Sequence, residues 1–143
     1  MIELRAEGIR LDFAPDLGRL DAFAVTDAGR EVAPLHRAPW VGTGEAMPPD
    51  APPLMAGLGG DFFCAPFALS EGESPLHGWP ANVAWQVNVA EGGVLRVVCS
   101  RPVFGATLVK DLSLADGHPF VYQRHVFVGG AGRVTAANHG NVS

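Results

Sequence analysis

Five histidines give this 143-residue sequence its clearest capacity for proton transfer. An imidazole gains and loses a proton near neutral pH, so it can act as a general acid or base with little tuning. The alternative is a polar residue at a strand end or turn, which we expect for His118, in the predicted turn 116–119, and for His36. The five residues are His36, His77, His118, His125 and His139.

Other kinds of active site lack their usual patterns in this sequence. The histidines form no His-x-His or His-x-x-x-His pair, and Cys64 and Cys99 do not have metal-ligand spacing. No serine lies in a nucleophile-elbow motif, and no glycine-rich phosphate loop follows a predicted strand. We therefore expect no metal site, no serine or cysteine nucleophile and no nucleotide phosphate site.

The composition excludes several classes of partner. Lysine and arginine number 10 against 15 acidic residues, and the arginines are spread singly along the chain, so nucleic acid is not an expected partner. The apolar runs are too short to span a membrane, and the N-terminus has no signal-peptide pattern. Two cysteines are too few for a disulfide framework. These features predict a cytoplasmic protein.

The elements that must position the histidines are predicted to be β-strands. Glycine (18) and proline (12) recur too closely to leave room for a core helix. Between them apolar and polar residues alternate, so that Ile9, Leu11 and Phe13 share one face of a strand. Regular spacing with turn residues at each break is typical of an all-β, antiparallel β-sandwich. Strands are predicted at 9–13, 20–25, 83–89, 94–100, 106–114, 120–128 and 134–137.

One segment does not follow this pattern of strands and turns. Ten of the 23 residues in 38–60 are Gly or Pro, which predicts a long surface loop of the kind that is either a functional rim or a disordered excursion. The sequence has no internal repeat and no domain boundary. Residues 1–143 are therefore predicted to form a single β-sandwich domain or a fragment of a larger one.

Two histidines lie in motifs that resemble those of a known family. Residues 59–67 read GGDFFCAPF and residues 75–85 read PLHGWPANVAW, so a CAPF run precedes a His-Gly and then tryptophan. Residues 137–141 read ANHGN, with an Asn-His pair. In this order the motifs resemble those of the aldose 1-epimerases (galactose mutarotases). The resemblance covers nearly the whole chain.

The resemblance implies a fold and a reaction. The fold would be a galactose mutarotase-like β-supersandwich that binds a hexose or related aldose in a cleft. The reaction interconverts the α and β anomers by acid and base catalysis of ring opening, which makes the enzyme an isomerase and needs no cofactor. His139 would be the acid at the ring oxygen, and His77 would hydrogen-bond the sugar near that oxygen and help to hold charge there.

The resemblance also implies which residues would bind the sugar. Asn138 belongs to the Asn-His motif, and Trp79 or Trp85 would offer an apolar face to the sugar ring. The family's sugar-clamping arginine is absent from residues 68–71, where Arg37 or Arg124 would have to replace it in space. Phe62 and Phe63 are expected to pack in the core.

Family members are much longer, and this chain matches their N-terminal portion. The glutamate that serves as their base lies beyond the matching segment. Half of a sandwich leaves strand edges and an apolar face without partners, which predicts either a fragment or a homodimer formed through exposed strand edges. In a dimer, Asp61 or Glu73 could supply a carboxylate. Two alternatives stay open: a non-catalytic carbohydrate-binding β-sandwich that lacks the base, and a β-sandwich whose only role is assembly.

Overall fold

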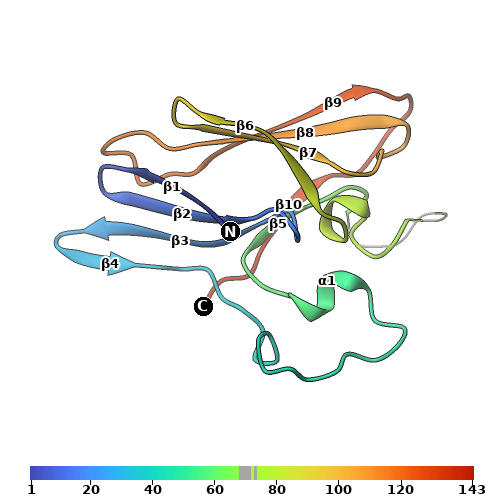
Figure 1. Ribbon diagram of the computed structural model, residues 1–143, viewed down its shortest axis with the longest axis horizontal. Helices are drawn as coiled ribbons and strands as arrows, with labels where there is room; N and C mark the ends of the chain where they lie inside the picture. The colour runs from blue at the N-terminus through green and yellow to red at the C-terminus, as the bar shows by residue number, and fades with distance from the viewer. Residues whose placement is uncertain (68–71, 73) are drawn as a thin grey trace.

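The chain folds into two stacked antiparallel β-sheets (Figure 1). The computed structural model describes residues 1–67, 72 and 74–143, and of residues 89 and 90 it describes only the backbone. Strands make up 46% of the chain and helices 5%. The predicted fold class, an all-β sandwich, is confirmed. In the described part of the chain, no helix has the length and apolar character needed to cross a membrane.

The first sheet contains both strands that carry the CAPF and Asn-His motifs. Its order is β1 (Ile2–Ala6), β2 (Ile9–Ala14), β3 (Arg19–Asp27), β5 (Asp61–Cys64) and β10 (Ala137–Gly140), with β4 (Arg30–Val32) paired to β3. The second sheet follows chain order, with β6 (Trp85–Glu91), β7 (Val94–Cys99), β8 (Ala106–Ser113) and β9 (Tyr122–Gly129). Two short helical turns, α1 (Pro53–Ala56) and the 3-10 turn η1 (Trp79–Ala81), complete the fold.

The core lies between the sheets. Leu11 and Phe13 of β2 are fully buried, as their alternation with polar residues predicts. They pack in one cluster with residues of the second sheet, among them Val97 and Leu108. Burial of this apolar surface is the main force that holds the two layers together. One charged residue, Lys110 of β8, is also fully buried there.

The structure shifts one predicted strand, adds three strands and shows a helical turn within the predicted loop. The strand expected at 134–137 begins at Ala137, where the prediction ends, and it runs to Gly140. Strands β1, β4 and β5 were not among the predicted strands. Segment 38–60 contains α1, and the indole nitrogen of Trp40 donates a hydrogen bond of 2.8 Å to the carbonyl oxygen of Met55. This loop therefore has internal structure, and Figure 1 places it beyond the first sheet on the side away from the second.

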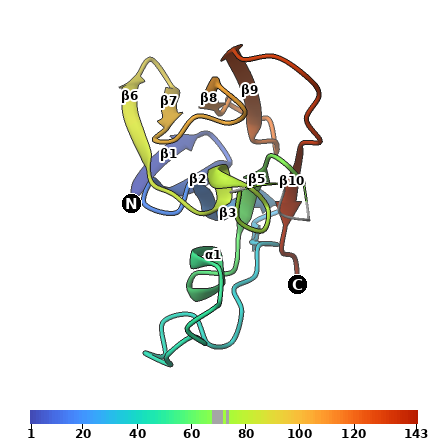
Figure 2. The same cartoon turned by 90° about the vertical axis from the view of Figure 1, so that its right-hand side faces the viewer.

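The first sheet receives β10 only after a long return of the chain. Figure 2 shows the segment that follows β9 leaving the second sheet and crossing to the first, where it becomes β10. There β10 pairs antiparallel with β5, and His139 lies opposite Phe62. This pairing brings the CAPF and Asn-His motifs side by side.

Candidate active site

The site begins with the register of β5 and β10. Successive side chains of a strand point to opposite faces, so Phe62 and Phe63 face different sides of the first sheet. Phe63 packs in the core between the sheets, whereas Phe62 packs with Leu54 of α1 on the outer face. His139 lies opposite Phe62 and stacks on it, with ring centroids 4.8 Å apart and planes 9° from parallel. His139 therefore belongs to the outer face of the first sheet.

The second motif brings His77 to the same place. Its ring meets that of His139 edge to face, with the centroids 5.1 Å apart. It also contacts the rings of Phe62, at 5.8 Å, and Phe67, at 5.9 Å. Two imidazoles from segments far apart in the sequence thus meet within a patch of aromatic rings. We call His77 and His139 the histidine pair.

The backbone that carries His77 is unusual. His77 has φ +63°, in the left-handed region that non-glycine residues seldom adopt. Gly78 follows with φ +76°, and a Cβ on it would lie 2.0 Å from the carbonyl oxygen of Ala65. Only glycine fits this close approach of the two motifs. Left-handed non-glycine residues cluster at functional sites, where the surrounding structure holds them in place.

Asn82 fixes this segment to its neighbours. Its amide nitrogen donates to the carbonyl oxygens of Leu76 and Gly78, at 2.8 and 2.7 Å. Its amide oxygen accepts a hydrogen bond of 3.1 Å from the backbone nitrogen of Leu54, in α1. Neither Asn82 nor Phe67 was a predicted site residue. The only signal for Asn82 is an asparagine after Trp-Pro-Ala, because such side chains often bond to nearby backbone groups.

Replacing Asn82 with alanine is expected to lower the free energy of unfolding by about 1–3 kcal/mol, because it leaves buried backbone groups without partners. It should also separate the rings of His77 and His139. Urea unfolding measures the first effect, and the imidazole NMR signals report the second. Asn88→Ala is the matched control, since Asn88 is an exposed residue of β6. Equal stability of the two variants would contradict the assigned role of Asn82.

His77→Gly is expected to be more stable than His77→Ala by about 1 kcal/mol. Both variants lose the imidazole and its ring contacts, so the difference isolates the cost of a Cβ at φ +63°. Paired urea titrations give this difference directly. If the alanine variant is the more stable of the two, the backbone of His77 does not have the left-handed conformation.

The electrostatics of the histidine pair favour an uncharged His77. Burial lowers the pKa of His77 below its ordinary value, and the neighbouring His139 lowers it further. The Nδ1 atom of His139 is buried and has no hydrogen-bond partner among the described residues. Buried polar atoms without partners are rare in folded proteins and call for an explanation.

A charged group borders the pair on the same face of the sheet. Arg19 lies opposite Phe62 on β3 and donates a 2.6 Å hydrogen bond to the buried carboxylate of Asp21. Arg37 also bonds to Asp21, and its side chain is 53% exposed. Among the predicted sugar-binding residues, Arg37 is therefore held close to this face by Asp21.

The structure does not bring every predicted residue to the histidine pair. Trp85 is buried in the core, where its indole donates to the carbonyl oxygen of Pro80 at 2.9 Å. Arg124 pairs with Asp111 at 3.6 Å on the second sheet. Asn138 faces away from His139, because it is the adjacent residue of the same strand. Trp79 is half-buried beneath the guanidinium of Arg101, 4.3 Å from its ring centroid.

The other histidines lie elsewhere. His36 is exposed, and His118 is exposed and forms a 2.7 Å hydrogen bond with the hydroxyl of Tyr122. His125 stacks on Phe63 between the sheets, with centroids 3.8 Å apart. Burial lowers the pKa of His125 to about 3, with a smaller contribution from the charge of Lys110.

Of the two carboxylates that were expected to assist from a dimer partner, the structure describes only Asp61. Asp61 lies next to Phe62 on β5 and so faces the other side of the sheet, where it accepts a 2.7 Å hydrogen bond from Gln123. Glu73 lies outside the described residues, as do residues 68–71, where the family has its arginine. Within the described part of the chain, no carboxylate forms an ion pair with His139.

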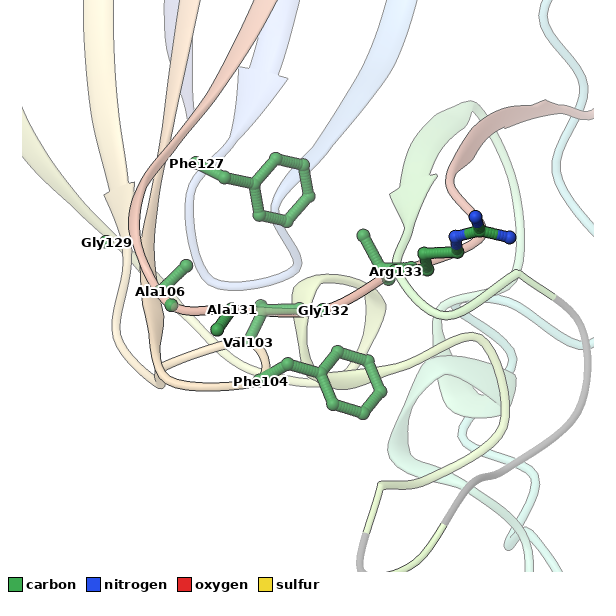
Figure 3. A pocket seen from close by; sticks show the side chains of 10 residues that line it. Val103, Phe104, Ala106, Phe127, Gly129, Ala131, Gly132 and Arg133 are labelled. Atoms are coloured by element: carbon green, nitrogen blue, oxygen red, sulfur yellow. The ribbon is translucent and has the colours of Figure 1, made fainter.

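A cavity of about 120 Å³ lies where β8 begins and β9 ends, and neither His77 nor His139 lines it. Figure 3 shows the residues that form its wall. Phe104, Phe127 and glycines form much of its wall, and the guanidinium of Arg133 points away from both phenyl rings. Most of the side chains that line this cavity are apolar, and Arg133 is the charged residue among them.

No protein-family model, curated protein or solved structure matches this chain. Across the described residues, no group of three or more potential ligands is placed to hold a metal ion. The geometry of the histidine pair is therefore the basis on which a function is assigned.

Proposed function

We propose that this protein binds a hexose or related aldose against the histidine pair and interconverts its α and β anomers. One observation carries the proposal: His77 and His139, from motifs far apart in the sequence, meet with ring centroids 5.1 Å apart. The finer fold, the N-terminal portion of a galactose mutarotase-like supersandwich, belongs to the same proposal. So does a cytoplasmic location, which the free Cys64 and Cys99 favour.

The reaction needs an acid and a base at one carbon atom. His139 gives a proton to the ring oxygen, and the bond between that oxygen and the anomeric carbon breaks. The anomeric hydroxyl loses its proton to a base and becomes the carbonyl of the open chain. After rotation about the C1–C2 bond, the same transfers run backwards and close the other anomer.

His77 is the proposed base, which accepts the proton of the anomeric hydroxyl. The ring oxygen and the anomeric hydroxyl are attached to the same carbon, so two imidazoles in contact can serve both. The lowered pKa of His77 favours its neutral form, which accepts a proton. His139 then carries the proton that is transferred to the ring oxygen. Each transfer changes which of the two rings is charged, and the pair returns to its starting state at the end of the cycle.

The surroundings of the pair suit a sugar. The rings of Phe62 and Phe67 flank His77 and can cover the apolar C–H face of a pyranose. The half-exposed guanidinium of Arg37 offers several N–H donors to hydroxyl oxygens. The carboxylate of Asp21, on the same face of the sheet, already accepts from Arg19 and Arg37.

A second candidate, a non-catalytic carbohydrate-binding sandwich, is favoured by a different observation. Among the described residues no carboxylate forms an ion pair with His139, so none of them is placed there as a base. The catalytic proposal gives the role of base to His77 instead, and a homodimer formed through exposed strand edges is the alternative source of a carboxylate. Edge strands β6 and β9 of the second sheet carry exposed Val87 and Val128, which would favour such pairing.

A sugar titration followed by imidazole NMR tests binding in both candidates. Adding D-galactose or D-glucose is expected to shift the ring signals of His77 and His139 and to leave those of His36 and His118 in place. The two unaffected histidines are exposed and serve as internal controls. Shifts confined to His36 and His118, or no shift with any aldose of a wide panel, would overturn the proposal.

A further inference from the structure

A second cavity lies between the two sheets, and neither His77 nor His139 lines it. Its volume is about 280 Å³, and it opens where the chain enters β9. Leu20 and Phe23 of β3 line it from the first sheet, and Phe120 and Val121 line it from the segment before β9. Most of its wall is therefore apolar, and Phe120, which is 61% exposed, stands at its edge.

One end of this cavity is polar and consists of hydrogen-bond acceptors. The carboxylate of Asp61 lines it and accepts one hydrogen bond of 2.7 Å, from the amide nitrogen of Gln123. The amide nitrogen of Gln123 is therefore already engaged as a donor. The amide oxygen is buried and has no hydrogen-bond partner in the described structure. Because this oxygen is buried from solvent, a ligand in the cavity would meet the carboxylate of Asp61 instead.

The charge of Asp61 is also not neutralised by direct contact. None of the ion pairs among the described residues includes Asp61. The buried ammonium of Lys110 on β8 interacts electrostatically with Asp61. Its hydrogen bond, of 3.2 Å, goes to the carbonyl oxygen of Gly18. Its ammonium also lies over the rings of Phe13 and Trp85. Asp61 therefore places a carboxylate that forms no ion pair with a described residue at the end of a mostly apolar cavity.

We propose that this cavity binds a small organic ammonium ion whose apolar body packs between Phe23 and Phe120. The ammonium group would donate to the carboxylate of Asp61, which also accepts from Gln123. An aromatic wall favours a cation over a neutral group of the same size. The volume suits a ligand of small size, because pockets for drug-sized molecules begin at about 300 Å³.

This site is separate from the proposed sugar site. Asp61 and Phe62 are adjacent residues of β5 and so face opposite sides of the first sheet. A ligand in the cavity would touch neither His77 nor His139. Failure of either proposal therefore leaves the other unaffected.

Titration calorimetry and NMR with 2-phenylethylammonium test the inference, with 2-phenylethanol as the neutral comparator. The amine is expected to bind at about millimolar concentration, as its small size allows. It should bind at least about tenfold more tightly than the alcohol, because a hydrogen bond to a charged group exceeds a neutral one. Backbone signals of Phe23, Val121 and Gln123 should shift, while the imidazole signals of His77 and His139 should not.

Three variants sharpen the test. Asp61→Asn keeps the shape and removes the charge, and it is expected to weaken amine binding at least about tenfold. Phe120→Ala removes an exposed wall of the cavity with little effect on the core, and should weaken binding severalfold. Asp50→Asn, an exposed carboxylate of segment 38–60, is the matched control and should bind like the parent chain.

Several results would overturn the inference. They are equal affinity for the amine and the alcohol, unchanged affinity in Asp61→Asn and Phe120→Ala, and shifts that map away from the cavity. Absence of binding at about tenfold above the expected concentration is another. Shifts of the same cavity residues on dilution alone would show that a second copy of the chain occupies the space instead.

Discussion

Replacing His139 with glutamine is expected to slow protein-catalysed anomer exchange at least about a hundredfold, the usual contribution of a positioned acid or base. Glutamine can donate a hydrogen bond to the ring oxygen but cannot deliver a proton to it. Its side chain can still pack on Phe62, which stacks with the imidazole in the parent chain. The variant should therefore fold and bind sugar while exchange falls towards the rate in buffer.

The matched control for this experiment is His118→Gln. His118 is exposed and contacts Tyr122, and its ring makes no contact with those of His77 and His139. This variant should exchange anomers at the rate of the parent chain. If His139→Gln retains full exchange, or if both variants lose it equally, His139 is not the acid.

The second large effect is a pH-dependent gain in stability on replacing Lys110 with methionine. Burial lowers the pKa of Lys110 from 10.5 to about 8, because a charged amine is costly in the core. Between these pH values the unfolded chain binds a proton that the folded chain does not, so stability of the parent chain rises with pH across this window. The shift corresponds to about 3 kcal/mol.

Lys110→Met removes this dependence. Below pH 8 the parent chain folds with a buried charge, so the methionine variant should be more stable there by up to about 3 kcal/mol. The gain is reduced by the lost hydrogen bond to Gly18. Above pH 10.5 the advantage should vanish. Urea unfolding at pH 7 and pH 10.5 measures both, and a methionine variant that is less stable at pH 7 would contradict this description of Lys110.

Hydrophobic alternation was a reliable guide wherever a strand has one buried face. Leu11 and Phe13 are buried as predicted, and β7 and β8 lie almost where the pattern places them. Strand β5 escaped prediction because its short run, Asp61–Cys64, lies between glycines and a proline and buries residues on both faces. Strand β10 was misplaced because its sequence is polar and its backbone pairs with β5.

The histidine pair shows the limits of sequence reasoning about a site. Motif resemblance selected His77 and His139, but their contact depends on the register that sets His139 opposite Phe62, which local pattern does not encode. Trp85 was expected at the sugar because tryptophan often binds sugar rings, yet its place on β6 directs it into the core. Arg124 was a candidate by charge alone, and the alternation of β9 places it on the second sheet, opposite Asp111.

Saturation-transfer NMR of freshly dissolved α-D-glucose and α-D-galactose tests the proposed activity most directly. With the purified chain, transfer between the α and β anomeric signals is expected to exceed the buffer rate and to fall to it in His139→Gln. A rate per chain that rises with protein concentration would identify a dimer as the active form. Exchange no faster than in buffer at every concentration, with sugar bound at the histidine pair, would contradict catalysis and leave carbohydrate binding as the function.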